Sequence, residues 1–379
     1  MKTLRQTLPS LSPVAVVPLV LLLTAFAPAA RSPQADIDRA AKLVRLARDT
    51  QNPADFRHAG ESAAKALTAD PENFDAQRYL AMALLGQQDL TAALDLASKL
   101  NKRVPDDIGI WTILSEVHAA RGDYAEAERC AQWVLDLRRN SPLGFSTAAR
   151  LREVYGDYEG ASEFYSEALR RTPESDAEER SWLLVQSARM LLRLKNTAGA
   201  AATLNEAEKL SPNSLQVLEQ KAELVGTKGE FAEAASLLAR ESQESPTAAH
   251  LYTYAKALDR AGMEDEARAI YGKLEAERSP DASALIFYYA DRKKNPEQAL
   301  VLATRQISDR HDTETLDAYA WALYRAGKFT EARTQIDKLL AIGSRDPEYV
   351  CHASRIAVQT PGIDSAAAHL SEAACETIP

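Results

Sequence analysis

The stretch Ala120-Arg-Gly-Asp-Tyr-Ala-Glu-Ala127 returns in altered form as Tyr155-Gly-Asp-Tyr-Glu-Gly-Ala161. In both copies Gly is followed by Asp and Tyr, and Ala stands three residues after the Tyr. Gly ends a helix cheaply because it accepts a left-handed backbone angle. Asp accepts hydrogen bonds from the free amide groups at the start of the next helix. The stretch therefore predicts two helices joined by a tight turn and packed closely at the Ala.

The Ala of this stretch keeps one register along the chain. It stands at Ala59, Ala93, Ala127, Ala161, Ala200, Ala234, Ala267, Ala299, Ala332 and Ala366. The successive spacings are 34, 34, 34, 39, 34, 33, 32, 33 and 34 residues. Turn glycines keep the same register at Gly122, Gly156, Gly229, Gly262 and Gly327. A single hairpin cannot bury its own apolar face, so this period predicts hairpins stacked into a solenoid.

At these residues the chain resembles the tetratricopeptide repeat family, from about residue 37 to residue 379. The resemblance implies an all-α fold, a right-handed α-solenoid superhelix of about ten helix-turn-helix repeats. Trp111-x-x-Leu114 matches the start of the family pattern, but Ser115 and His118 replace its Gly and Tyr. The eighth unit is weak, because Asn295-Pro-Glu-Gln298 supplies its turn.

The register also divides the chain. We expect a signal peptide over 1–30, an N-terminal lead-in over 31–39, units one to four over 40–173, an acidic insertion over 174–180 and units five to ten over 181–379. The insertion accounts for the 39-residue step, and we expect it to be a longer acidic turn that forms a mild bend or hinge. The adjacent carboxylates Glu178 and Glu179 are expected to be solvated.

Composition and the N-terminus set limits on function. The 379 residues are 46% apolar and carry a net charge of −9, which argues against nucleic acid and anionic membranes as main partners. Lys2 and Arg5 precede an apolar core over 14–26 and the small residues Ala27-Pro-Ala-Ala30. This pattern predicts a cleaved secretory signal and a location in the periplasm or cell envelope. An uncleaved inner-membrane anchor is the alternative.

Motifs that carry chemistry are absent from the sequence. It has no phosphate-binding Gly-rich loop, no H-E-x-x-H, no C-x-x-C and no G-x-S-x-G. No two of the six histidines lie four residues apart, so each is expected to be a partly exposed helix residue. Cys130 is expected in the core, and Cys351 with Cys375 forms either a disulfide or two semi-buried thiols. We therefore expect no enzyme, no cofactor and no small-molecule substrate.

The resemblance implies that the first helix of each unit lines a concave groove. Counted from the marker Ala, its aromatic and basic residues are Trp182, Arg189, Arg193, Tyr252, Arg260, Tyr288, Arg292, Trp321, Tyr324 and Arg325. The acidic residues Glu219, Glu223, Asp259, Asp291 and Asp317 share this surface. Aromatics beside charge are typical of protein interfaces, although packing between helices is the alternative explanation.

These observations predict a scaffold that binds protein or peptide partners in the concave groove. The alternative is a membrane-anchored structural subunit of an envelope assembly, secretion or polysaccharide export complex. It applies if the N-terminal segment is retained, and only then does the membrane become a partner.

Overall fold

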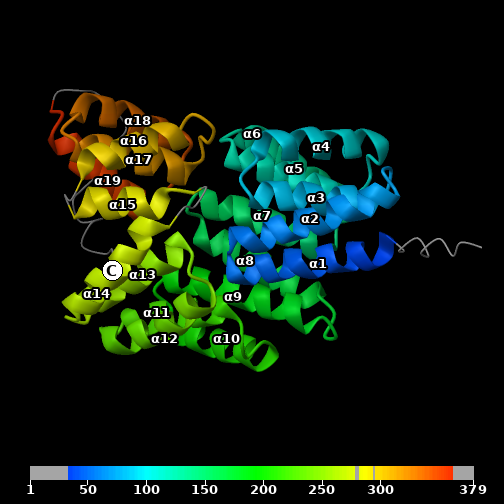
Figure 1. The fold of residues 1–379 in the computed structure, drawn as a ribbon, viewed down its shortest axis with the longest axis horizontal. Coiled ribbons are helices and arrows are strands. Elements are labelled where there is room, and N and C mark those ends of the chain that lie inside the picture. Colours follow the sequence, from blue (N-terminus) through cyan, green and yellow to red (C-terminus); the bar gives the residue numbers. More distant parts are fainter. Residues whose placement is uncertain (1–32, 278–280, 293–294, 362–379) are drawn as a thin grey trace, which may run out of the picture.

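The computed structural model describes residues 33–277, 281–292 and 295–361, and every regular element within them is an α-helix (Figure 1). The helices are α1 (Pro33–Thr50), α2 (Pro53–Ala69), α3 (Phe74–Gly86), α4 (Leu90–Arg103), α5 (Ile108–Ala120), α6 (Tyr124–Leu137), α7 (Pro142–Val154), α8 (Tyr158–Arg171), α9 (Ala177–Arg193), α10 (Thr197–Leu210), α11 (Leu215–Gly226), α12 (Phe231–Glu244), α13 (Ala248–Arg260), α14 (Glu264–Ala276), α15 (Ser283–Asp291), α16 (Pro296–Gln306), α17 (Thr313–Arg325), α18 (Phe329–Ala341) and α19 (Pro347–Val358). Consecutive helices pair into hairpins and the hairpins stack side by side. The predicted right-handed α-solenoid is confirmed.

The marker alanines lie in the interior between paired helices. All nine that lie in the described residues are buried, with at most 4% of their surface exposed, and Ala366 lies outside those residues. The five turn glycines have φ between 67° and 81°, the left-handed conformation that their position requires. Gln88 and Lys195 take the same conformation in units whose turn lacks Gly.

The acidic insertion is mostly helical, which corrects the predicted long turn. α8 ends at Arg171 and α9 begins at Ala177, so residues 177–180 form the first turn of α9. α9 has 17 residues, whereas α5, for example, has 13. The Asp176 side chain accepts a hydrogen bond from the backbone N–H of Glu179 (3.3 Å), and acidic residues stabilise the positive end of a helix. α1 begins at Pro33 and so includes residues 33–39 of the predicted lead-in.

The superhelix closes on itself along a seam, where turns of early units contact the starts of later units. In Figure 1 the first helices lie beside units five and six. The turns before α6 and α8 contact the C-terminal units, where Gly122 approaches His311 and Gly156 approaches Arg345. Among the seam contacts are Asp49 with Ser214, Tyr124 with Thr313, and Tyr158 with Asp346. The latter two pairs are separated by 189 and 188 residues, so one superhelical turn takes between five and six units.

Several single-residue expectations are settled by burial. Cys130 is a free, fully buried thiol, as predicted. Cys351 is disulfide-bonded, and Cys375 lies outside the described residues, as does the predicted signal peptide. His250 and His352 are 2% and 8% exposed, so the expectation of partly exposed histidines is wrong for both. In the described part of the chain, no helix is long and apolar enough to cross a membrane.

Candidate partner-binding site

The ten predicted groove residues all lie on or directly after the first helices of units five and seven to nine. Arg193, Arg260 and Arg292 are exposed, and five others are half-buried: Trp182, Arg189, Tyr252, Tyr324 and Arg325. Tyr288 and Trp321 are only 3% and 2% exposed. In this structure those two rings pack between helices and are closed to a partner. The binding role of the remaining residues stays a prediction.

Trp321 is the centre of an aromatic and acidic cluster on α13, α15, α17 and α19. Its indole Nε1 donates to Asp291 Oδ1 at 2.7 Å, and the Tyr252 hydroxyl donates to Asp291 Oδ2 at 3.1 Å. The Trp321 ring stacks on His352 with centroids 4.1 Å apart, and on Tyr324 at 4.9 Å. The cluster therefore ties four successive units together through side chains that the repeat pattern alone presents as separate.

His352 is the residue of this cluster that sequence reasoning missed. Its Nδ1 lies 2.9 Å from both carboxylate oxygens of Asp317, which is itself 1% exposed. Burial alone lowers the pKa of His352, but the carboxylate of Asp317, with those of Glu348 and Asp291, raises that pKa overall. Nothing in the local sequence separates His352 from an exposed helix histidine, because its partner lies on another unit.

A ladder of ion pairs links the first helices of neighbouring units. Arg150 binds Glu116 at 2.5 Å, Arg189 binds Glu153 at 2.6 Å, and Arg292 binds Asp259. The partners are 34, 36 and 33 residues apart, close to the repeat length. That spacing is a signal the sequence contains. Pairs of this partial exposure stabilise a fold only weakly, so their main effect is to fix where each guanidinium points.

The predicted groove aromatic of unit five is already covered. The guanidinium of Arg48, at the end of α1, lies over the Trp182 ring at 4.5 Å from its centroid. Arg48 also binds Glu179 at 2.6 Å, so the carboxylate pair expected to be solvated contacts α1. Deeper in the same face, burial raises the pKa of Glu219, the neighbouring Arg189 lowers it, and Glu223 raises it again.

Among residues 33–277, 281–292 and 295–361, no group of three or more His, Cys, Asp or Glu side chains is placed to hold a metal ion. The face offers hydrogen-bond donors, acceptors and aromatic rings, which suit recognition of another macromolecule.

Comparison with known proteins decides the family. Two sequence families described as tetratricopeptide repeat match the chain, one over residues 42–108 and the other over residues 111–133. This chain contains tetratricopeptide repeats. No curated protein is significantly similar to it in sequence.

Solved structures share the fold of this tetratricopeptide-repeat protein. The crystal structure of the APC/C hetero-tetramer Cut9-Hcn1 matches with a TM-score of 0.50 and 16% identity, over 79% of this chain and 52% of that chain. The human IFIT1 dimer with m7Gppp-AAAA matches with a TM-score of 0.52 and 14% identity, over 76% of this chain and 80% of that one. The tetratricopeptide-repeat protein thus spans about half the length of the Cut9-Hcn1 chain. At these identities the likeness concerns the fold alone.

Proposed function

We propose that this tetratricopeptide-repeat protein is a protein–protein interaction scaffold of the cell envelope. It binds partner proteins or peptides on the first helices of units five to nine. The observation that carries the proposal is the set of exposed arginines at the ends of those helices, Arg193, Arg260 and Arg292, each beside aromatic or acidic side chains. The tetratricopeptide repeats themselves support protein binding as the general function.

Two of these arginines are held in place before a partner arrives. Arg260 lies over the Phe231 ring at 4.1 Å, and Arg292 lies over the Tyr271 ring at 4.5 Å. A side chain ordered in this way loses less conformational entropy on binding. Guanidinium groups pair well with carboxylates, so an acidic segment of a partner protein fits this row.

The envelope location rests on the N-terminal sequence. Lys2 and Arg5, the apolar core over 14–26 and the small residues that end at Ala30 support export followed by cleavage. If the segment is retained instead, the protein is the membrane-anchored structural subunit described above.

Affinity capture of the full chain from its native cells tests the proposal. We expect the chain to be captured with defined proteins from the envelope fraction, and its N-terminus, determined by mass spectrometry, to be Arg31 or a close neighbour. The double variant Arg193→Glu with Arg260→Glu is expected to reduce capture about tenfold or more, because it reverses charge on the proposed face. Its circular dichroism should match the wild type.

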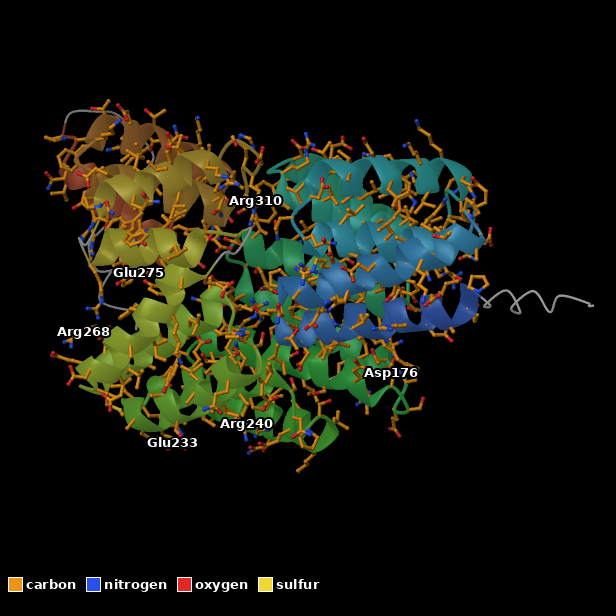
Figure 2. All side chains as sticks on the ribbon, viewed as in Figure 1. Asp176, Glu233, Arg240, Arg268, Glu275 and Arg310 are labelled. Carbon is orange, nitrogen blue, oxygen red and sulfur yellow. The ribbon has the colours of Figure 1, made fainter. Side chains whose placement is uncertain are left out.

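The matched control places the same charge reversal on second helices, as Arg240→Glu with Arg268→Glu. Figure 2 shows both arginines at the outer edge of the molecule, on α12 and α14, where they are exposed. Equal loss of capture by both double variants would mean that net charge alone matters. Unchanged capture by the first variant would remove the groove assignment, and an intact Met1 would favour the anchored subunit.

A further inference from the structure

The C-terminal end of α1 docks across the seam on a face formed by α9, α11 and the turn before α13. Its segment Arg48-Asp49-Thr50 makes side-chain and backbone contacts there with residues 131 to 195 positions away. The contacts are directional hydrogen bonds and ion pairs, whereas consecutive units pack through apolar side chains. The segment is therefore recognised by its chemistry as well as by shape.

Asp49 is an acidic residue at the C-terminal end of α1. An acidic residue at the end of a helix is unfavourable there, because it meets the negative end of the helix dipole. Its carboxylate instead accepts hydrogen bonds from the Ser214 hydroxyl and, at 3.2 Å, from the backbone N–H of Leu215. These groups form the positive start of α11, so the choice of Asp is explained by the distant unit alone.

Arg48 and Thr50 complete the recognition on either side. The Arg48 guanidinium stacks on Trp182 at 4.5 Å and binds Glu179 at 2.6 Å. The Gln216 side-chain amide donates to the carbonyl oxygen of Arg48. The Ser245 hydroxyl donates to the carbonyl oxygen of Thr50 at 2.9 Å. The docking face thus contacts the charged groups of Arg48 and Asp49 and also the backbone carbonyl oxygens of Arg48 and Thr50.

The irregular step of the repeat builds this face. Glu178 and Glu179 lie in the extra first turn of α9, which exists because of the insertion before residue 181. Glu178 lies 3.5 Å from Arg45, so both added carboxylates face the end of α1. A regular 34-residue unit would lack them. The one insertion in the repeat array coincides with the docking face.

Unit one packs on unit two through two small buried clusters, to which partly buried side chains such as Tyr79 add. One cluster contains Ile37, Ala66 and Ala76, and the other contains Val44, Ala59 and Ala83. Across the seam, the Arg48 and Glu179 side chains are 34% and 29% exposed, and ion pairs of that kind stabilise weakly. The ion pair that holds Arg48 across the seam is therefore a weak one, which an arginine of another segment can replace.

We propose that this face is a recognition site for an Arg followed directly by an acidic residue, and that the protein's own first unit occupies it as an autoinhibitory latch. We call it the Arg-Asp site, formed by Glu179, Trp182, Ser214, Leu215 and Gln216. Its partner is a protein segment that presents the Arg-Asp pair at the end of a helix and displaces α1. The inference deepens the proposed function, because it names the partner chemistry of unit five and assumes a protein partner.

A peptide of residues 45–52, Arg-Leu-Ala-Arg-Asp-Thr-Gln-Asn, labelled with a fluorophore is the probe. Its fluorescence anisotropy is measured with the full chain and with the double variant Arg48→Ala and Asp49→Ala, whose latch is released. We expect the variant to bind the peptide at least about tenfold more tightly than the wild type does. The matched control Arg57→Ala with Glu61→Ala removes an exposed ion pair of α2 away from the seam and should bind like the wild type.

Two further arms identify the site. Adding Trp182→Ala to the latch variant should abolish the gain, and a peptide in which Arg48 and Asp49 are interchanged should not bind. Equal binding to wild type and latch variant, or a gain that survives Trp182→Ala, overturns the proposal.

A measurement on the wild type does not depend on how the variant folds. Saturating peptide should increase hydrogen exchange of the α1 amides, and unchanged exchange there also overturns the latch. These outcomes are separate from the capture experiment. The capture of native partners by the Arg193→Glu and Arg260→Glu variant tests the proposed scaffold function. The binding of the labelled peptide tests only the Arg-Asp site.

Discussion

At the scale of single residues, Glu241 departs most from what a helix surface should carry. It is 1% exposed, and within the described residues neither carboxyl oxygen has a hydrogen-bond partner. Burial, followed by the carboxylates of Glu219 and Asp49, raises the pKa of Glu241 to about 9. It faces His250 Nε2 at 3.4 Å, and burial lowers the pKa of that histidine. The pair is therefore neutral at pH 7 and lies behind the seam.

Glu241→Gln is expected to stabilise the protein at alkaline pH. The carboxyl pKa is about 4.5 when unfolded and about 9 when folded, so its contribution to stability is complete below pH 4.5 and is lost as pH rises to 9. Removing the ionisable group should raise the free energy of unfolding by roughly 4 kcal/mol more at pH 8 than at pH 5, because three pH units correspond to about 1.4 kcal/mol each. Urea unfolding at the two pH values measures this difference. Glu244→Gln, an exposed neighbour on α12, should show no such difference, and a gain at pH 5 equal to that at pH 8 would contradict the pKa explanation.

At the scale of elements, the seam joins a turn of one unit to the first turn of a helix in another. The phenol oxygen of Tyr124, at the start of α6, accepts a hydrogen bond of 2.9 Å from the backbone N–H of Thr313 at the start of α17. Thr313 is buried, so this N–H has no water to replace the phenol. Next to it, Arg310 binds Asp281 at 2.9 Å and Asp312 at 2.8 Å, and Figure 2 shows Arg310 where the C-terminal units face α6.

Tyr124→Phe should destabilise the fold by about 1–3 kcal/mol, because it leaves a buried backbone donor without an acceptor. The control is Tyr155→Phe, whose hydroxyl donates to Glu128 at 2.6 Å in an exposed contact, and it should cost less than about 1 kcal/mol. Denaturant midpoints at constant m-value compare the two variants. Equal midpoints would show that the Tyr124 contact contributes nothing particular to the seam.

At the scale of the whole molecule, closure of the superhelix limits which residues a turn can use. A Cβ on Gly122 would lie 2.5 Å from the carbonyl oxygen of His311, and one on Gly156 would lie 2.8 Å from the carbonyl carbon of Arg345. A Cβ on Gly229 would meet nothing within 4 Å, although its φ of 81° matches the 78° of Gly122. The left-handed backbone conformation favours Gly at all three positions. Only at Gly122 and Gly156, which lie at the seam, is there also no room for a side chain.

Gly122→Ala and Gly229→Ala form a matched pair that isolates closure. Each should lower the free energy of unfolding by at least roughly 1–2 kcal/mol, because each places Ala in the left-handed conformation. Gly122→Ala should lose more than Gly229→Ala and should also open the seam. Hydrogen exchange should then rise at the start of α17, and the radius of gyration from small-angle scattering should grow. Identical behaviour of the two variants would argue that the seam is not maintained in solution.

The repeat register predicts much of the fold, since markers such as Ala93 and Ala234 owe their burial to local packing of paired helices. The candidate site is less predictable, because exposure depends on distant units. Trp321 and Arg193 both occupy groove positions, yet the first is buried against His352 and Asp291, and the second is exposed. In the sequence Glu179 belongs to an acidic run that is expected to be solvated, whereas in the structure it pairs with Arg48 of α1.

The sequence by itself determined the helices, their pairing and the 34-residue stacking, because each depends on turn, cap and apolar spacing within one unit or its neighbour. Only the tertiary structure decided that the superhelix closes after five to six units, that the insertion extends α9, and that Arg48 covers Trp182. These features join residues more than 130 positions apart through a few polar contacts, and no periodic pattern in the sequence marks such contacts.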